Sequence, residues 1–151
     1  MKNFITTVLA VLSIPSLSMA HDHAASPLES ALKQYVTIQA ALASDSLKGV
    51  PEAASALATT AKENAGKLPA PLVAQAEAVE KATDIKAARA AFKPLSATLI
   101  AAASAAEEKT GHYYEAFCPM AGAAWIQADK KVANPYYGAN MLTCGEIRKE
   151  L

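Results

Sequence analysis

The chain has 151 residues, and its 14 basic and 14 acidic side chains leave no formal net charge at neutral pH. The basic residues form no run, so the chain lacks the electrostatic signature of nucleic-acid binding, and we expect no nucleic-acid partner. Apart from a stretch near the N-terminus, no apolar segment approaches the roughly 20 residues that a membrane-spanning helix requires.

The start of the chain has the features of a secretory signal peptide. Lys2 supplies one positive charge, residues 4–14 form a short apolar run, and Ser18-Met19-Ala20 offers small residues at the two positions that a signal peptidase reads. The run is too short for a membrane anchor. We therefore expect residues 1–20 to be a signal peptide that is cleaved after Ala20. The remaining chain would be exported without inserting into the membrane.

Cleavage there leaves 131 residues, a normal size for one domain, with a net charge of −1 because Lys2 is the only charge lost. Residues 21–25 are predicted to be a polar tail and residues 26–151 a single helical domain. The new N-terminus, His21-Asp22-His23, has a free amine and a histidine at the third position, which together can bind Cu(II) in a square plane of nitrogen donors. The alternative is a tail without a function, because chain termini are commonly disordered.

Four amphipathic helices are predicted in the alanine-rich part of the chain. Their ends carry capping and breaking residues, in chain order Ser26-Pro27, Gly49, Pro51, Gly66, Pro71 and Asp84. Their apolar residues recur at spacings of three and four, as in Leu28, Ala31, Leu32, Tyr35, Ile38 and Leu42 of the first helix and Ile85, Ala88, Phe92, Leu95 and Leu99 of the fourth. Pro94 is expected to kink the fourth helix because it cannot donate a backbone hydrogen bond.

Short connections between amphipathic helices favour antiparallel neighbours. We therefore predict an all-α fold, an up-and-down bundle of about four helices. The composition changes at Gly111. From residue 111 to residue 147, alanine gives way to a segment predicted to be irregular, which holds both cysteines, the single tryptophan and four of the five tyrosines. We expect this C-terminal segment to carry the function.

Two pairs of sulfur side chains lie in that segment. Cys118 and Met120 are two residues apart around a proline, so that in an extended backbone they face one way. Met141 and Cys144 are three residues apart, which places them on one face of a helical turn. The turn-forming residues 134–138 lie between the pairs and can fold the second pair back onto the first.

Two thiolates and two thioethers form a soft set of ligands, which favours Cu(I) and, by extension, Ag(I) over hard cations. The alternative is a disulfide between Cys118 and Cys144, the usual state of an even number of cysteines in an exported protein, with the methionines filling the core. Such a disulfide closes a loop of about 26 residues and would stabilise the fold by roughly 3–4 kcal/mol. The two interpretations are compatible, since a reversible disulfide can release a metal on oxidation.

The segment resembles a known periplasmic family. The runs Phe-Cys-Pro-Met-Ala, Asn-Pro-Tyr-Tyr-Gly and Met-Leu-Thr-Cys-Gly-Glu, between Tyr114 and Ile147, are similar to the domain of unknown function 3347, and Ala-Ala-Phe-Lys-Pro-Leu-Ser near Pro94 fits more loosely. Domains of this kind also occur fused to adaptors of heavy-metal efflux pumps. The resemblance therefore implies a periplasmic location, copper or silver as the bound ion, and a component of such an efflux system as partner. The family's recurring ligands correspond to Cys118, Met120, Met141 and Cys144.

Two further features have competing interpretations. His112 is a candidate additional ligand that could complete the site in a folded-back segment, but a single histidine near a helix end more often caps carbonyls or faces water. Trp125 and the tyrosines can shield Cu(I) from water, although a small core beneath the loop is the more common use of aromatic residues.

Three functions compete on this sequence. The first is a periplasmic Cu(I)-binding protein, and the second is a disulfide-stapled interaction domain without metal. The third is an enzyme or electron-transfer protein, which the sequence supports least. It has no Cys-x-x-Cys pair, no haem-attachment motif, no nucleophile turn and no phosphate-binding loop. We predict that the protein is not an enzyme.

Overall fold

A computed structural model describes residues 25–107 and 112–151 of the chain. Four helices come first, α1 (Pro27–Ala43), α2 (Val50–Glu63), α3 (Leu72–Glu80) and α4 (Ile85–Ala105). They are followed by the strands β1 (Tyr114–Cys118) and β2 (Ala123–Gln127), the short 3-10 helix η1 (Gly138–Met141), and β3 (Glu146–Glu150). The predicted signal peptide, its cleavage after Ala20 and the His21 and His23 copper site all lie outside the described residues.

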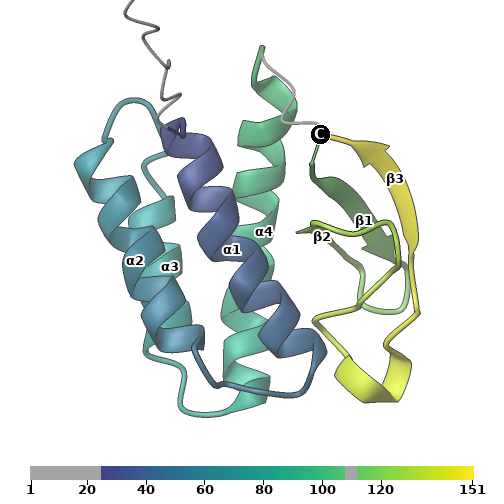
Figure 1. The fold of residues 1–151 in the computed structure, drawn as a ribbon. Coiled ribbons are helices and arrows are strands. Elements are labelled where there is room, and N and C mark those ends of the chain that lie inside the picture. Colours follow the sequence, from purple (N-terminus) through teal and green to yellow (C-terminus); the bar gives the residue numbers. More distant parts are fainter. Residues whose placement is uncertain (1–24, 108–111) are drawn as a thin grey trace, which may run out of the picture.

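The predicted caps begin two of the helices. The Ser26 side chain accepts a hydrogen bond of 3.1 Å from the amide of Glu29, with Pro27 as the first helical residue of α1. The Asp84 carboxylate accepts one of 2.8 Å from the amide of Ala87 at the start of α4. Pro94 lies inside α4 without ending it. The helices run alternately up and down, and each contacts the next (Figure 1). The predicted helical bundle is therefore present.

The prediction of an all-α fold with an irregular C-terminal segment is wrong. That segment forms a three-stranded antiparallel sheet with the strand order β2-β1-β3, so the fold is mixed α/β. The two strand pairings bring Ala116 of β1 opposite Trp125 of β2 and Ile147 of β3. Strand formation satisfies the backbone hydrogen bonds of an extended segment, which would otherwise be left unpaired where the segment is buried.

The sheet covers the side of the bundle formed by α1 and α4, away from α2 and α3 (Figure 1). Aromatic side chains from the helices, from the sheet and from the loop before β3 pack together in one core. Tyr35 of α1 stacks on Phe92 of α4 with ring centroids 4.7 Å apart, and the Tyr35 hydroxyl accepts a hydrogen bond of 3.2 Å from the amide of Ile126 in β2. Trp125 is fully buried and meets Tyr136 edge to face. The aromatic residues therefore complete one core.

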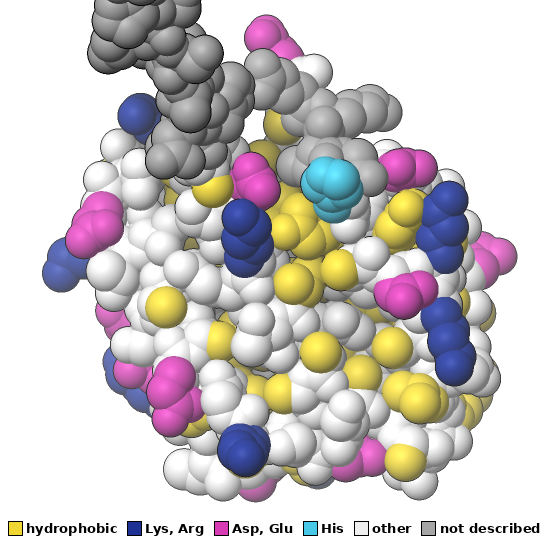
Figure 2. Space-filling model, in the orientation of Figure 1, with side chains coloured by type: hydrophobic (Ala, Val, Ile, Leu, Met, Phe, Trp, Pro, Cys, Tyr) yellow, Lys and Arg dark blue, Asp and Glu magenta, His cyan; other side chains and the backbone are white. Residues whose placement is uncertain are grey.

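The face of the molecule seen in Figure 2 is mixed in charge. Figure 2 shows lysine and arginine side chains interspersed with aspartate and glutamate over the visible face. Within residues 25–107 and 112–151, no helix has both the length and the apolar character needed to cross a bilayer.

Candidate functional site

The two cysteines meet at the end of the central strand. Cys118 is the last residue of β1 and is fully buried, whereas Cys144 lies in the loop before β3 and is partly exposed. Their sulfur atoms are 2.6 Å apart, and no disulfide bond joins them in this structure. The antiparallel pairing of β1 with β3, in which Phe117 lies opposite Glu146, brings the two sulfurs together across 26 residues of chain.

Gly145 allows this close approach. Its φ of +140° lies in a region that side-chain-bearing residues rarely adopt. A Cβ atom there would lie 2.7 Å from Cη2 of Trp125 and 3.0 Å from the carbonyl oxygen of Phe117. The glycine therefore lets the chain pass between the tryptophan ring and β1 directly after Cys144.

The buried Asn134 side chain holds the loop in place. Its Nδ2 donates to the carbonyl of Cys144 at 2.8 Å, and its Oδ1 accepts from the amides of Tyr136 at 2.8 Å and Tyr137 at 3.3 Å. Its backbone amide also donates to the carbonyl of Leu142 at 2.8 Å. The Asn-Pro-Tyr-Tyr-Gly run is thus a turn whose first residue ties it to the segment that carries Cys144.

The two thiols differ in acidity. Burial raises the pKa of the Cys118 thiol, but the Cys144 thiol and the backbone amides of Ala121 and Met120 donate hydrogen bonds that outweigh burial, so the pKa of Cys118 is lowered from its ordinary value. The pKa of Cys144 is raised, first by its hydrogen bond to Cys118 and then by burial. Cys118 is therefore the thiol that ionises first, and Cys144 stabilises its thiolate.

The two methionines lie in turns close in sequence to the cysteines. Met120 belongs to the turn between β1 and β2, and its carbonyl accepts a hydrogen bond of 3.0 Å from the Tyr137 hydroxyl. Its side chain is 67% exposed. Met141 ends η1 and is partly buried, and its carbonyl accepts a 3.0 Å hydrogen bond from the amide of Cys144. The fold thus brings the two thiols into contact, and the thioethers remain predicted ligands on neighbouring turns.

His112 does not belong to this site. It is exposed and precedes β1, whereas Cys118 ends that strand. From Tyr114 to Cys118 the strand alone extends about 13 Å at roughly 3.3 Å per residue, which separates the imidazole from the sulfurs. Within the part of the chain that the structure describes, no three His, Cys, Asp or Glu side chains gather as a metal site. A metal ion at the thiols would therefore have two cysteine ligands and would need further donors of another kind.

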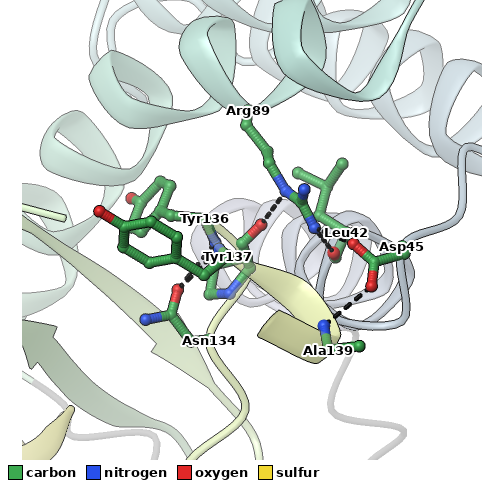
Figure 3. A network of polar contacts seen from close by, with 8 residues as sticks. Leu42, Asp45, Arg89, Asn134, Tyr136, Tyr137 and Ala139 are labelled. Carbon is green, nitrogen blue, oxygen red and sulfur yellow. Dashed lines mark hydrogen bonds and ion pairs between the residues drawn. The ribbon is translucent and has the colours of Figure 1, made fainter. Parts of the chain in front are cut away.

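Sequence reasoning missed a second group of residues, which anchors the loop above the site (Figure 3). Arg89 of α4 donates through Nε to the carbonyl of Pro135 at 2.7 Å, and through Nη2 to the carbonyl of Leu42 at 2.8 Å and to Oδ1 of Asp45 at 2.6 Å. The other Asp45 oxygen accepts a hydrogen bond of 2.8 Å from the amide of Ala139. The sequence feature that could have indicated this group is the arginine within the alanine-rich run of α4. A long cationic side chain among small residues is free to reach a neighbouring segment.

Gly138 fits against this ion pair. Its φ is +56°, and a Cβ atom there would overlap the Asp45 carboxylate and the Arg89 guanidinium. The hydrogen bond from Ala139, followed by that from Arg89, lowers the pKa of Asp45 below its ordinary value of 3.8. One ion pair therefore joins the end of α1, the N-terminal part of α4 and the loop that precedes Cys144.

A comparison with protein families identifies the class of this chain. The family model described as "Protein of unknown function (DUF3347)" matches residues 31–111, which is more than half of the chain, so the chain belongs to this family. The match begins within α1, covers α2, α3 and α4, and ends before β1. The Cys and Met motifs between Tyr114 and Ile147, on which the resemblance was first based, thus lie outside the matched range. No curated protein and no solved structure matches the chain.

Proposed function

We propose that this protein binds a soft monovalent metal ion, Cu(I) or Ag(I), in the periplasm, with Cys118 and Cys144 as thiolate ligands. The observation that carries the proposal is the contact of the two sulfur atoms, 2.6 Å apart at the edge of the fold. Thiolates are the protein ligands that soft ions prefer, and Cys118 is already the more acidic of the pair.

Metal binding requires the sulfurs to separate. At about 2.3 Å per metal–sulfur bond, taken from zinc thiolates, two sulfurs that share one ion lie roughly 3.8–4.6 Å apart. Cys118 is held in the central strand, but Cys144 is partly exposed in a loop outside the strands. A shift of about 1–2 Å in the Cys144 loop supplies the difference between the observed distance and this separation.

The thioethers of Met120 and Met141 are the proposed further ligands. Both lie in turns close in sequence to the two cysteines, and Met120 is exposed enough to reorient without disturbing the core. Thioether sulfur is soft and suits Cu(I). The resemblance of this segment to domains fused to efflux adaptors supports a role in metal buffering, transfer or resistance, with an efflux component as partner. We infer a binding role rather than catalysis.

A Cu(I) competition titration of residues 21–151, reduced and without oxygen, tests this proposal. We expect one ion per chain. The substitution Cys144→Ser should abolish binding, and the similarly shaped Met120→Leu and Met141→Leu should each weaken it by roughly tenfold or more. Thr143→Ser, an exposed neighbour without sulfur, is the matched control and should leave the affinity unchanged. If the reduced protein does not compete for Cu(I), the metal proposal is wrong.

The second candidate is a disulfide-stapled interaction domain without metal. The contact of the two sulfurs and the burial of Cys118 favour it specifically. Such a disulfide closes a loop of 26 residues and stabilises the fold by about 3.5 kcal/mol in the chain-entropy model.

Thiol counting in air, followed by thermal unfolding, separates the two candidates. A staple predicts no free thiol in the folded protein and a lower midpoint for Cys118→Ser whether or not copper is present. A metal site predicts that Cys118→Ser mainly removes the stabilisation that added Cu(I) gives, because a ligand that binds only the folded state raises stability by mass action.

A further inference from the structure

An open pocket of about 360 Å³ lies beside the thiol site, where the first turns of α4 face the turn between β1 and β2. Lys86, Arg89 and Lys93 of α4 line one side of it, and Met120 and Tyr137 line the other. We call these five residues and the space between them the basic pocket. Its position links the outer surface of α4 to the turn that directly follows Cys118.

The basic pocket is positive. Its lining has three cations and no carboxylate. The Lys93 ammonium is held in place, since it donates to the carbonyl of Ala121 at 2.9 Å and lies 5.5 Å from the centroid of the Tyr136 ring. Lys86 is exposed in the first turn of α4, where the helix dipole adds to the positive potential.

The carboxylates of Asp45 and Asp84 do not line the pocket and do not cancel this charge fully. Asp45 pairs with Arg89, which leaves the charges of Lys86 and Lys93. Asp84 accepts the amide hydrogen bond that caps α4. Attraction between opposite charges is strongest where one sign is concentrated in a concave surface, so the basic pocket favours an anionic ligand.

Met120 gives the pocket a second chemical character. Its side chain is 67% exposed, the highest value among the large apolar residues that the structure describes. The Tyr137 hydroxyl holds the Met120 backbone through its carbonyl, so the thioether is exposed on a fixed turn. Methionine is common on binding surfaces because its flexible, polarizable side chain adapts to different partners.

We propose that the basic pocket docks an acidic segment of a partner protein that exchanges the metal ion with this site. The assignment of an exchange role rests on the proposed metal-binding function. Carboxylates of the partner would lie against Lys86 and Lys93, which would bring the partner's own sulfur ligands to Met120 and then to Cys118. Docking by charge speeds encounter and orients the two proteins, and Met120 is the first sulfur that the ion would meet.

The test uses the metal-free, reduced protein, so that it stays independent of whether the protein binds copper. The probes are a short synthetic peptide of alternating Glu and Met, and its counterpart of alternating Lys and Met. Binding is followed by the amide NMR shifts of isotope-labelled protein. We expect the acidic peptide to bind and to shift the amides around Lys86, Lys93 and Met120. The basic peptide should not bind, and salt should weaken the acidic complex.

Charge reversal on α4 provides the variant and its control. Lys86→Glu combined with Lys93→Glu should weaken binding of the acidic peptide at least roughly tenfold, because like charges then face each other. Lys62→Glu combined with Lys67→Glu makes the same change in net charge near the other end of the bundle, and should change the affinity less than about twofold.

Three results would overturn the docking proposal. One is that the wild-type protein binds the acidic and the basic peptide with equal affinity. Another is that the control variant at Lys62 and Lys67 loses as much affinity for the acidic peptide as the variant at Lys86 and Lys93. The third is that inorganic phosphate alone produces the same shifts at similar concentration, which would make the pocket a small-anion site. Peptide binding without Cu(I) binding would support the docking surface and disprove the metal site. Cu(I) binding without peptide binding would support the metal site and disprove the docking surface.

Discussion

Arg89 connects three segments of the chain through one planar cation. Its guanidinium donates hydrogen bonds to the carbonyls of Leu42 and Pro135 and to the carboxylate of Asp45. The other oxygen of that carboxylate accepts a hydrogen bond from the amide of Ala139. A lysine has one ammonium and cannot present this fork of donors. At the scale of single residues, then, the position of the Cys144 loop depends on an ion pair that contacts neither sulfur.

The stability that Asp45 provides should depend on pH. Because the pKa of Asp45 in the folded protein lies below 3.8, its contribution is fully present above about pH 4 and is lost as the pH falls through the lower folded value. We therefore expect the free energies of unfolding of the wild type and Asp45→Asn to differ most at neutral pH and to converge below about pH 4. Urea titrations at a series of pH values measure this. A constant difference down to the lowest pH would show that the ionised carboxylate contributes nothing.

At the scale of elements, the sequence predicted the helices better than the strands. Each helix is long enough to repeat its apolar face, and Ser26 and Asp84 marked two starts that the structure confirms. The strands have five residues each, and β3 reads Glu-Ile-Arg-Lys-Glu, so hydrophobic alternation had little chance to appear. β2 follows β1 through a short turn, whereas β3 pairs with β1 over a long sequence separation, and a single sequence does not display that second pairing.

The site was predicted in part for the same reason. The spacing of the sulfur residues and the turn at Asn134 indicated that Cys118 and Cys144 could meet, and the two sulfurs are in contact. The burial of Cys118 and the exposure of Met120 could not be predicted from the sequence, because both depend on which face of β1 packs on the helices.

The entry into β3 depends on Gly145. We expect Gly145→Ala to destabilise the fold by about 1–3 kcal/mol, because the added methyl group meets the Trp125 ring and the alanine must adopt a strained backbone. The displaced loop should also make Cys118 react faster with a thiol reagent. Urea unfolding and thiol labelling measure the two effects.

Gly122→Ala is the matched control for that variant. Gly122 also has a positive φ, of +56°, but open space surrounds the position of its Cβ. It should therefore cost only the backbone strain, about 1 kcal/mol, and leave Cys118 as protected as in the wild type. If the two glycine variants behave alike, the contact with Trp125 is not what makes Gly145 necessary.

At the scale of the whole molecule, the sheet is part of the core. Family similarity reaches residue 111, yet Trp125 and Ile126 beyond it are fully buried against α1 and α4. Tyr35 and Phe92 pack in the same aromatic cluster as Tyr136. The helices of the matched region therefore leave an apolar face that the strands cover.

A chain that ends at residue 111 should not fold as a stable bundle. Removal of the sheet exposes the apolar face of α1 and α4 to water. Loss of the buried Trp125 and Ile126 side chains alone lowers the free energy of unfolding by roughly several kcal/mol. We expect helical far-UV circular dichroism, a weak near-UV signal and a broad thermal transition. A sharp transition at the midpoint of the full chain would show that the sheet is a separate unit.

The different settings of the two cysteines impose an order of events. Cys118 is enclosed within the central strand, while Cys144 lies at the rim on a loop. A reagent, oxidant or metal carrier that arrives from solvent therefore encounters Cys144 before Cys118, although Cys118 is the more readily ionised thiol. In the proposed metal site, an ion received at Met120 would meet the thiol of Cys144 at the rim before the enclosed thiol of Cys118, and release would follow the same route backwards. The two thiols would then react in a fixed order, the partly exposed one first and the buried one second.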